Sequence, residues 1–417
     1  MKILLINKSF ETGGAAIAAR RLWQALKKNK AEATLMVYDE TSPRKDGLIV
    51  VTKTKWGKLK WWRNFIAERL YFLPCEKNKS VRFAFSPAVS GENISKTAEV
   101  KQADVVHLHW FNQGFLSLRN LNQLARLGKP IVWTLHDMWA FTGGCHYNDD
   151  CYRYVTQCGQ CKLLKNPKER DLSTKIFRQK KEFFDRADIT FVTCSSWLQT
   201  EAEKAKLLEG KRILTIPNPI DTQLYCPADR KTVRQRMHLP LDKKLILFGA
   251  ANVGDARKGV SYLIEALQSL KERNDIEILL FGKNGNSVAE KIPFKVHDFG
   301  LLASEKIIEL YQVADMFALP SLQDNLPNTV MESLSCGTPV VAFNIGGIPE
   351  MIDHQTNGYL ATYKSTDDLA AGIRWVLENN VDNVLGTAAR DKVLRCFSEE
   401  VVAKQFVELY HSLVTKK

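Results

Sequence analysis

The sequence predicts an α/β protein built from two domains, each with a parallel sheet, and three observations support this. Short continuous apolar runs alternate with amphipathic stretches, which is the pattern of parallel strands covered by helices on both faces. The pattern restarts near residue 244, and 417 residues exceed what one hydrophobic core usually serves. Between the two series lies a connecting segment rich in proline and charge, IPNPIDTQLYCPADRKTVRQRMHLPLDKK.

The predicted elements follow in order along the chain. The first series of strands covers residues 2–7, 33–38, 104–110, 130–137, 189–195 and 213–218, and the second covers 244–250, 276–282, 315–321 and 339–344. We therefore place an N-terminal domain at 1–220 and a C-terminal domain at 221–395. A last helix, within 396–417, is expected to return to the first domain. Ligands of such sheets bind at the carboxyl ends of the strands, so two facing domains are expected to form a cleft.

Composition narrows the class of protein. An apolar share of 45% and a charged share of 25% are typical of a globular chain. Neither a membrane-spanning stretch nor a signal-peptide pattern is found, so we expect a cytoplasmic protein. The net charge is +13, and the first hundred residues hold 19 Lys and Arg against 9 Asp and Glu. An anionic partner is expected there, but no nucleic-acid-binding module accompanies the charge, and we predict no nucleic-acid partner.

The stretch DNLPNTVMESL suggests a ligand site in the second domain. Pro327 suits the start of a helix, and the next amides, of Asn328, Thr329 and Val330, would face a phosphate. Asp324 and Glu332 would then flank this anion and bind hydroxyl groups, in the order sugar, diphosphate, ribose. The alternative is that Asp324 caps the helix and Glu332 is a solvated surface residue.

A glycine-bearing loop with two cations favours the first interpretation. In AANVGDARKGVSYLIEAL, Arg257 and Lys258 precede a predicted helix directly after the first strand of the second domain. Cations and free amides at a helix start can hold a diphosphate.

These motifs carry a resemblance to a known family. DARKGVSYLIEAL, DFGLLASEKIIELYQVADMFALPS and DNLPNTVMESLSCGTPVVAFNIGGIPEMI resemble the donor domain of retaining glycosyltransferases of family 4, as do INKSFETGGAAIAARRL and IPNPIDTQLYCP more loosely. The likeness is greatest to bacterial enzymes of surface-polysaccharide assembly, the colanic-acid type included. It implies the GT-B architecture of two Rossmann-like domains, a UDP- or GDP-sugar donor, a glycan or lipid-linked saccharide acceptor, retention of configuration and no catalytic metal.

The resemblance also assigns roles to residues. Asp324 and Glu332 match the two acids of the family's E-x7-E motif, at the donor sugar and the ribose, and Lys258 matches the lysine on the donor phosphates. His136 falls beside the reacting sugar. The predicted catalytic residues are His136, Asp324 and Lys258. The predicted donor-binding residues are Gly13, Gly14, Arg257, Lys258, Asp324, Asn325, Leu326, Asn328, Thr329 and Glu332.

The chain departs from the family pattern at three positions. The first acid is Asp324 rather than glutamate, Pro327 replaces a glycine, and Val253 stands where an arginine is common, so Arg257 is taken as its substitute. Two alternatives follow: a non-catalytic partner subunit of the same fold, and an enzyme that epimerises or phosphorolyses a nucleotide sugar.

We assign no general base to the reaction. We expect His107 and His109 to be structural, because strand alternation explains their spacing.

Two further segments predict interactions. Cys145, Cys151, Cys158 and Cys161 have spacings that suit structural zinc, with His146 as a substitute ligand, and free thiols in a loop are the alternative. Residues 53–72 place an apolar, tryptophan-rich stripe among lysines and arginines. This pattern predicts either a peripheral helix on an anionic membrane or an ordinary amphipathic helix packed on the first domain.

Overall fold

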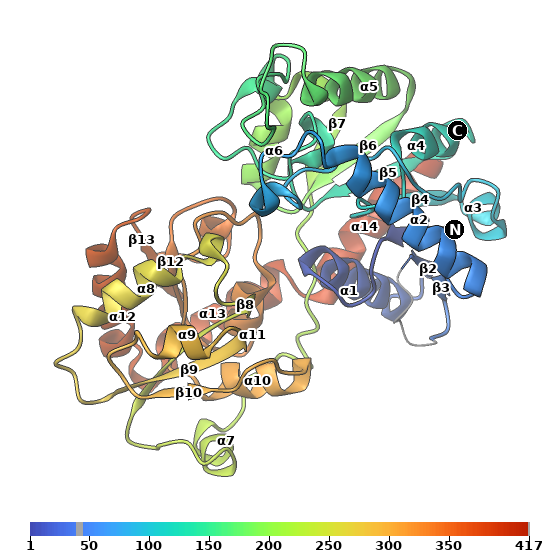
Figure 1. Cartoon of the computed structure of the whole chain (residues 1–417). Coiled ribbons are helices and arrows are strands. Elements are labelled where there is room, and N and C mark those ends of the chain that lie inside the picture. Colours follow the sequence, from blue (N-terminus) through green and yellow to red (C-terminus); the bar gives the residue numbers. More distant parts are fainter. Residues whose placement is uncertain (39–44, 416–417) are drawn as a thin grey trace. The chain divides into compact units, whose positions relative to one another are not determined.

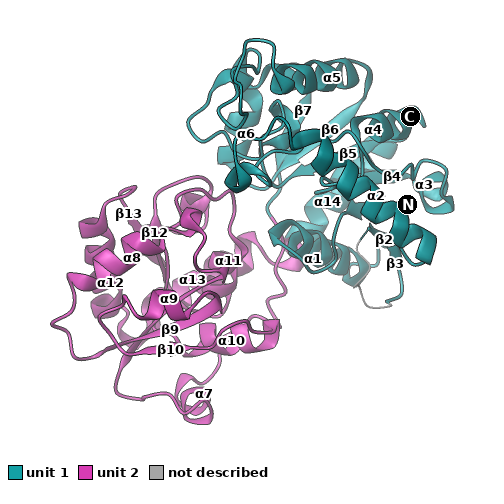
Figure 2. Ribbon diagram, viewed as in Figure 1, with its two compact units in different colours: residues 1–217, 402–417 teal, residues 218–401 magenta. Residues whose placement is uncertain are grey.

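A computed structural model describes residues 1–38 and 45–415, which divide into two compact units (Figures 1 and 2). Unit 1 comprises Met1–Pro217 and Val402–Lys417, and unit 2 comprises Asn218–Val401. The last two residues of the expected C-terminal helix, 416 and 417, lie outside the described part. None of the described helices is long and apolar enough to cross a membrane.

The sheet of unit 1 has seven parallel strands among the described residues, in the order β3-β2-β1-β4-β5-β6-β7. They are β1 (Lys2–Asn7), β2 (Glu32–Val37), β3 (Leu48–Val50), β4 (Val105–Leu108), β5 (Ile131–Leu135), β6 (Ile189–Thr193) and β7 (Arg212–Thr215). Its helices are α1 (Gly14–Lys28), α2 (Lys55–Phe72), α3 (Ala98–Gln102), α4 (Leu118–Ala125), α5 (Leu172–Arg186) and α6 (Ser196–Lys204).

Alternate residues of β1 are buried in two different cores. Leu4 and Ile6 pack into one cluster, whereas Ile3 and Leu5 pack into another, so both faces of the sheet are covered. This explains the continuous apolar runs in the sequence. The second cluster also includes Phe406 and Tyr410 of the last helix, α14 (Glu399–Val414), most of which belongs to unit 1.

Unit 2 has a six-stranded parallel sheet in the order β10-β9-β8-β11-β12-β13, counted over the described residues. The strands are β8 (Lys244–Asn252), β9 (Ile276–Lys283), β10 (Val296–Asp298), β11 (Met316–Leu319), β12 (Val340–Phe343) and β13 (Gly358–Ala361). The helices are α7 (Arg230–Arg236), α8 (Val260–Gln268), α9 (Asn286–Ala289), α10 (Ser304–Val313), α11 (Asn328–Ser335), α12 (Thr366–Asn379) and α13 (Val384–Cys396). The order changes direction at β8 and β11, where such sheets bind ligands.

The two parallel sheets confirm the predicted fold class. Three strands were not predicted: β3, β10 and β13. Each lies at the edge of its sheet, where a short strand pairs on one side only and needs no continuous apolar run.

Candidate active site

In unit 2, the loops that follow β8 and β11 are joined to each other. The amide of Leu322 donates to the carbonyl of Arg257 at 2.7 Å. Gly259 lies between the 3-10 turn Ala256–Lys258 and α8 with φ +67°, and a Cβ there would lie 1.8 Å from the carbonyl oxygen of Pro320. Only glycine permits this close approach, which fixes the lysine-bearing loop against the end of β11.

This junction brings two predicted site residues together. Lys258 and Asp324 are 66 positions apart, yet the lysine Nζ lies 2.7 Å from the Asp324 Oδ2. Both side chains are largely buried, with 26% and 14% exposed. An ammonium group has three hydrogens to donate, so the contact with one carboxylate leaves it able to donate to further acceptors.

Arg257 has a different partner. Its guanidinium pairs with Asp255 in the same turn, at 2.7 Å, and its side chain is 57% exposed. An exposed pair of this kind contributes little to stability. Of the two predicted cations, Lys258 is the one paired with Asp324.

Helix α11 starts directly after Pro327, as the sequence predicted. Asn325 and Leu326 are buried in the loop before it, and Thr329 is half-buried in its first turn. The amide of Val330, one of three expected to face a phosphate, instead donates to the carbonyl of Pro327 at 3.1 Å. That backbone bond is a difference from the expected arrangement.

The alternative interpretation of the two acids is wrong. Asp324 is not the N-cap residue of α11, because that position is Pro327, and the Asp324 Oδ2 accepts from Lys258 instead. Glu332 is not a solvated surface residue, since only 7% of it is exposed, and the hydroxyl of Tyr311 donates to its Oε2 at 3.2 Å. Burial of a carboxylate is costly unless it is hydrogen-bonded, and the bond from Tyr311 offsets part of this cost for Glu332.

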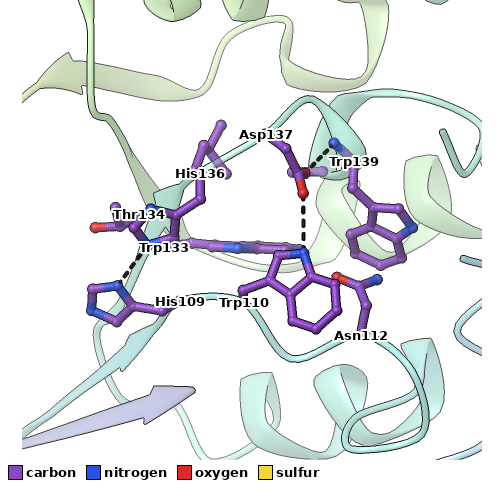
Figure 3. A pocket seen from close by; sticks show the side chains of 10 residues that line it. His109, Trp110, Asn112, Trp133, Thr134, His136, Asp137 and Trp139 are labelled. Atoms are coloured by element: carbon purple, nitrogen blue, oxygen red, sulfur yellow. Dashed lines mark hydrogen bonds between the residues drawn. The ribbon is translucent and has the colours of Figure 1, made fainter. Parts of the chain in front are cut away.

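Unit 1 contains a small polar pocket at the carboxyl ends of β4 and β5 (Figure 3). Its cavity of about 10 Å³ has room for about one water molecule. His109, Trp110 and Asn112 line it from the segment after β4, and His136 and Asp137 from the segment after β5. Among the described residues, the buried His109 Nε2 and Asn112 Nδ2 have no hydrogen-bond partner.

Asp137 is the most connected group of this pocket. Its Oδ2 lies 2.6 Å from His146 Nδ1 and accepts from Trp110 Nε1 at 3.0 Å, and its Oδ1 accepts from the amide of Trp139 at 2.8 Å. Burial raises the pKa of Asp137, but His146 and these hydrogen bonds outweigh it and hold the pKa below its ordinary value. Asp137 is therefore the ionised acid of this pocket, paired with His146.

The half-buried His136 extends a row formed by the buried His107 and His109. Its Nε2 lies 3.0 Å from His109 Nδ1, and the ring of His109 lies 4.3 Å from that of His107, centroid to centroid. Burial lowers the pKa of His136 to about 4 and that of His107 to about 3. The ordinary pKa of histidine is near 6.5, and the lowered pKa values lie far below 7. These rings are therefore neutral at pH 7.

The other two predicted residues of unit 1 lie at the start of α1. Gly13 is the N-cap residue, with φ +94°, and its carbonyl accepts from the amides of Ala16 and Ile17 at 3.1 and 3.2 Å. Gly14 is the first helical residue, and both glycines are exposed.

Two sequence profiles match this chain. The profile described as Glycosyltransferase Family 4 matches residues 12–224, which is more than half of the chain, and the profile described as Glycosyl transferases group 1 matches residues 229–392. The chain belongs to glycosyltransferase family 4. An uncharacterized glycosyltransferase of Methanocaldococcus jannaschii is 25% identical over 327 residues, covering 75% of this chain and 76% of the relative.

Solved structures show that this glycosyltransferase has the GT-B fold. Sucrose-phosphate synthase from Thermosynechococcus elongatus superimposes with a TM-score of 0.69 at 18% identity, covering 100% of both chains. Anabaena HepE in complex with UDP-glucose gives 0.63 at 17% identity, covering 99% of this chain and 100% of that one. At such identities the likeness concerns the fold.

The cysteine segment of the glycosyltransferase does not support the zinc hypothesis. In the described part of the chain, no group of three or more His, Cys, Asp or Glu side chains could hold a metal ion, and Cys145, Cys151, Cys158 and Cys161 are free thiols. Burial raises the pKa values of the first, third and fourth of these thiols.

The segment that carries the four cysteines is held in place by hydrogen bonds. The Cys158 Sγ accepts from the amide of Gly143 at 3.1 Å, and both ring nitrogens of His146 are engaged, by Asp137 and by Ser86 Oγ at 2.9 Å. The fully buried Lys180 donates from Nζ to the carbonyl of Thr142 at 3.1 Å and to that of Trp139. These hydrogen bonds hold the segment, and the alternative of free thiols in a loop fits the structure.

Sequence reasoning missed several groups of the enzyme's candidate site. Asp137 directly follows His136 in TLHD, and its place at a strand end was the available signal. His109 was expected to be structural, but its contact with His136 places it in the pocket. His107 does fit a structural role, because its two nitrogens lie 2.7 Å from Tyr410 Oη and Thr134 Oγ1.

Proposed function

We propose that this glycosyltransferase moves a sugar from a UDP- or GDP-sugar to a glycan or lipid-linked saccharide, with retention of the anomeric configuration. The proposal includes a role in bacterial surface-polysaccharide assembly of the colanic-acid type, which rests on the resemblance of the sequence. The observation that carries the donor site is the Lys258–Asp324 pair, held at the joined ends of β8 and β11 beside the start of α11.

The proposed donor lies along these groups of unit 2. Lys258 binds the diphosphate, Asp324 accepts from hydroxyl groups of the sugar, and Glu332 accepts from the ribose hydroxyls. Asn325, Leu326, Asn328 and Thr329 shape the space between the two acids. Anabaena HepE, which shares the fold, was solved with UDP-glucose, and this supports a nucleotide sugar as the ligand class.

The chemistry of the step explains why a lysine is needed. Breaking the bond between the anomeric carbon and the diphosphate builds negative charge on the leaving phosphate and oxocarbenium character on the sugar. A fixed ammonium beside the phosphate stabilises the first, and the carboxylate of Asp324 holds the ammonium in place before substrate binds. Such preorganised groups typically contribute about 2.7–4 kcal/mol to the transition state. The proposal requires no catalytic metal.

The proposed acceptor side is in unit 1. His136, neutral because burial lowers its pKa to about 4, is proposed to lie beside the reacting sugar. Its Nε2 contacts His109 and its Nδ1 lies 3.6 Å from Cys194 Sγ, so a hydrogen bond to the sugar would replace one of these contacts. Gly13 and Gly14, exposed at the start of α1, are proposed to lie beside the ligand, at a helix N-terminus that favours anions.

The experiment is a product assay with UDP- and GDP-sugars and a set of glycan and lipid-linked saccharide acceptors, run with and without a chelator. We expect nucleoside diphosphate release that depends on the acceptor, unchanged by the chelator. With an α-linked donor, nuclear magnetic resonance of the product should show a new α-linkage. A β-linkage would contradict retention, and hydrolysis of the donor alone would contradict transfer.

A further inference from the structure

Helix α2 is packed with its polar residues inward. Asn64 and Glu68 are buried, with 2% and 0% exposed. The Asn64 Nδ2 donates to the hydroxyl of Tyr38 at 3.0 Å, and the Glu68 Oε2 accepts from the amide of Gly114 at 2.8 Å. The buried Phe72 and the half-buried Trp61 also pack on the core of unit 1. The inward side of α2 therefore mixes polar and apolar side chains, whereas a surface helix ordinarily turns its apolar face to the core.

The outward face of α2 carries a line of exposed apolar side chains. Five of its side chains follow helical spacing, and we call them the α2 stripe: Trp56 (75% exposed), Leu59 (60%), Trp62 (54%), Ile66 (46%) and Leu70 (61%). Exposed Leu73 and Phe83 continue the apolar surface beyond the helix. Scattered exposed apolar residues are ordinary, but a continuous stripe of this size marks an interaction surface.

The orientation of α2 is fixed by close packing. A Cβ at Gly114 would lie 2.8 Å from the backbone nitrogen of Phe65, so the helix backbone touches the loop after β4. Phe72 at its end stacks on Phe85, with ring centroids 4.9 Å apart. The helix cannot turn its stripe inward without losing these contacts and the hydrogen bonds of Asn64 and Glu68. The alternative of an ordinary amphipathic helix packed on the first domain holds in part: α2 packs on unit 1, but the α2 stripe is exposed.

Charge identifies the kind of partner. Residues 53–72 contain six Lys and Arg and one acidic residue, Glu68, which faces inward. Lys53, Lys55, Lys58, Lys60 and Arg63 are all exposed around the stripe. Tryptophans with an apolar body among basic side chains suit the boundary between acyl chains and anionic headgroups. A second protein copy would bring the same positive charge against itself.

We propose that α2 docks on an anionic lipid surface, with the α2 stripe in the acyl boundary and the surrounding cations on the headgroup phosphates. The proposal deepens the proposed function by naming the surface on which a lipid-linked acceptor is met. It does not depend on the donor site, because the stripe belongs to unit 1 and the donor residues belong to unit 2.

The test is flotation of the full chain with vesicles of phosphatidylcholine alone or mixed with phosphatidylglycerol. We expect binding to the anionic vesicles, decreasing as salt rises. Leu59→Ser should weaken binding by roughly three- to tenfold, because less apolar surface is buried. Lys55→Glu should weaken it by about fivefold or more.

Matched controls are available in unit 2. Leu301 is 61% exposed, close to the 60% of Leu59, and Lys231 is exposed as Lys55 is. Leu301→Ser and Lys231→Glu should leave flotation unchanged. Absence of binding to anionic vesicles at low salt, or equal losses in controls and stripe variants, would overturn the proposal. So would a dimer that dissociates on Leu59→Ser, because a second copy would then occupy the stripe. Donor binding, measured by thermal shift without vesicles, reports separately on the proposed function.

Discussion

Replacing Lys258 with methionine is expected to lower kcat/KM about 10²- to 10³-fold. Its ammonium is held 2.7 Å from Asp324 and is the paired cation at the proposed diphosphate site. Removing one preorganised donor from a site where charge develops typically costs about 2.7–4 kcal/mol of transition-state stabilisation. Most of the loss should appear in kcat, since the charge on the phosphate grows as the bond breaks.

The matched control is Lys392→Met. Lys392 also lies in unit 2, also pairs with an aspartate, Asp353, at 2.8 Å, and is 17% exposed. Steady-state kinetics of both variants should show the loss only for Lys258, whereas their thermal midpoints should fall by similar amounts. Equal activity losses would mean that the effect is structural and would count against the assignment of Lys258.

Replacing Gly259 with alanine is expected to destabilise unit 2 by about 2–5 kcal/mol and to abolish donor binding. The residue has φ +67°, which costs an L-residue roughly 1–2 kcal/mol. The new Cβ would also lie 1.8 Å from the Pro320 carbonyl oxygen, a backbone atom that cannot move without displacing the end of β11. Overpacking of this kind adds about 1–3 kcal/mol.

Gly300 separates the two causes. It lies in the same unit with φ +59°, but a Cβ there would meet nothing within 4 Å. Gly300→Ala should therefore show only the backbone cost, roughly 1–2 kcal/mol. Thermal and denaturant unfolding of both variants measures the difference. If Gly259→Ala were no more destabilising than Gly300→Ala, the two loops would not be joined as described.

The inner strands of both sheets could be predicted from the sequence, because burial on two faces requires continuous apolar runs such as KILLIN and KLILFG. Among the edge strands, β7 was predicted from ILTIPN, whereas the short β3, β10 and β13 were not, since one-sided pairing requires no continuous apolar run. The start of α11 was predictable from Pro327, because proline suits a helix start, and in the structure it is the N-cap residue.

Long-range packing explains what sequence reasoning missed in the candidate site. The Lys258–Asp324 contact depends on Gly259 meeting Pro320, which no local pattern reveals. The charge of Asp137 depends on His146 and Trp110 arriving from other segments. Cysteine spacing suggested a metal, but spacing does not report side-chain direction. For α2 the stripe was visible, although only the buried Asn64 and Glu68 show which face is outward.

The central claim, that the groups around α11 bind a nucleotide sugar, is tested most directly by ligand-induced thermal shifts. The parent chain, Glu332→Gln and Glu277→Gln are screened against UDP-, GDP- and dTDP-sugars. Glu277 is a matched control, because it is also 7% exposed in unit 2 but lies near the amino end of β9, away from the proposed site.

Ligand at about 100 times its dissociation constant adds about 2.7 kcal/mol to the folded state. The account predicts that one donor class raises the midpoint of the parent and of Glu277→Gln. The shift of Glu332→Gln should be clearly smaller, since loss of a hydrogen bond to a charged group weakens binding by roughly tenfold or more. No shift with any nucleotide sugar, or the same reduction in both variants, would contradict it.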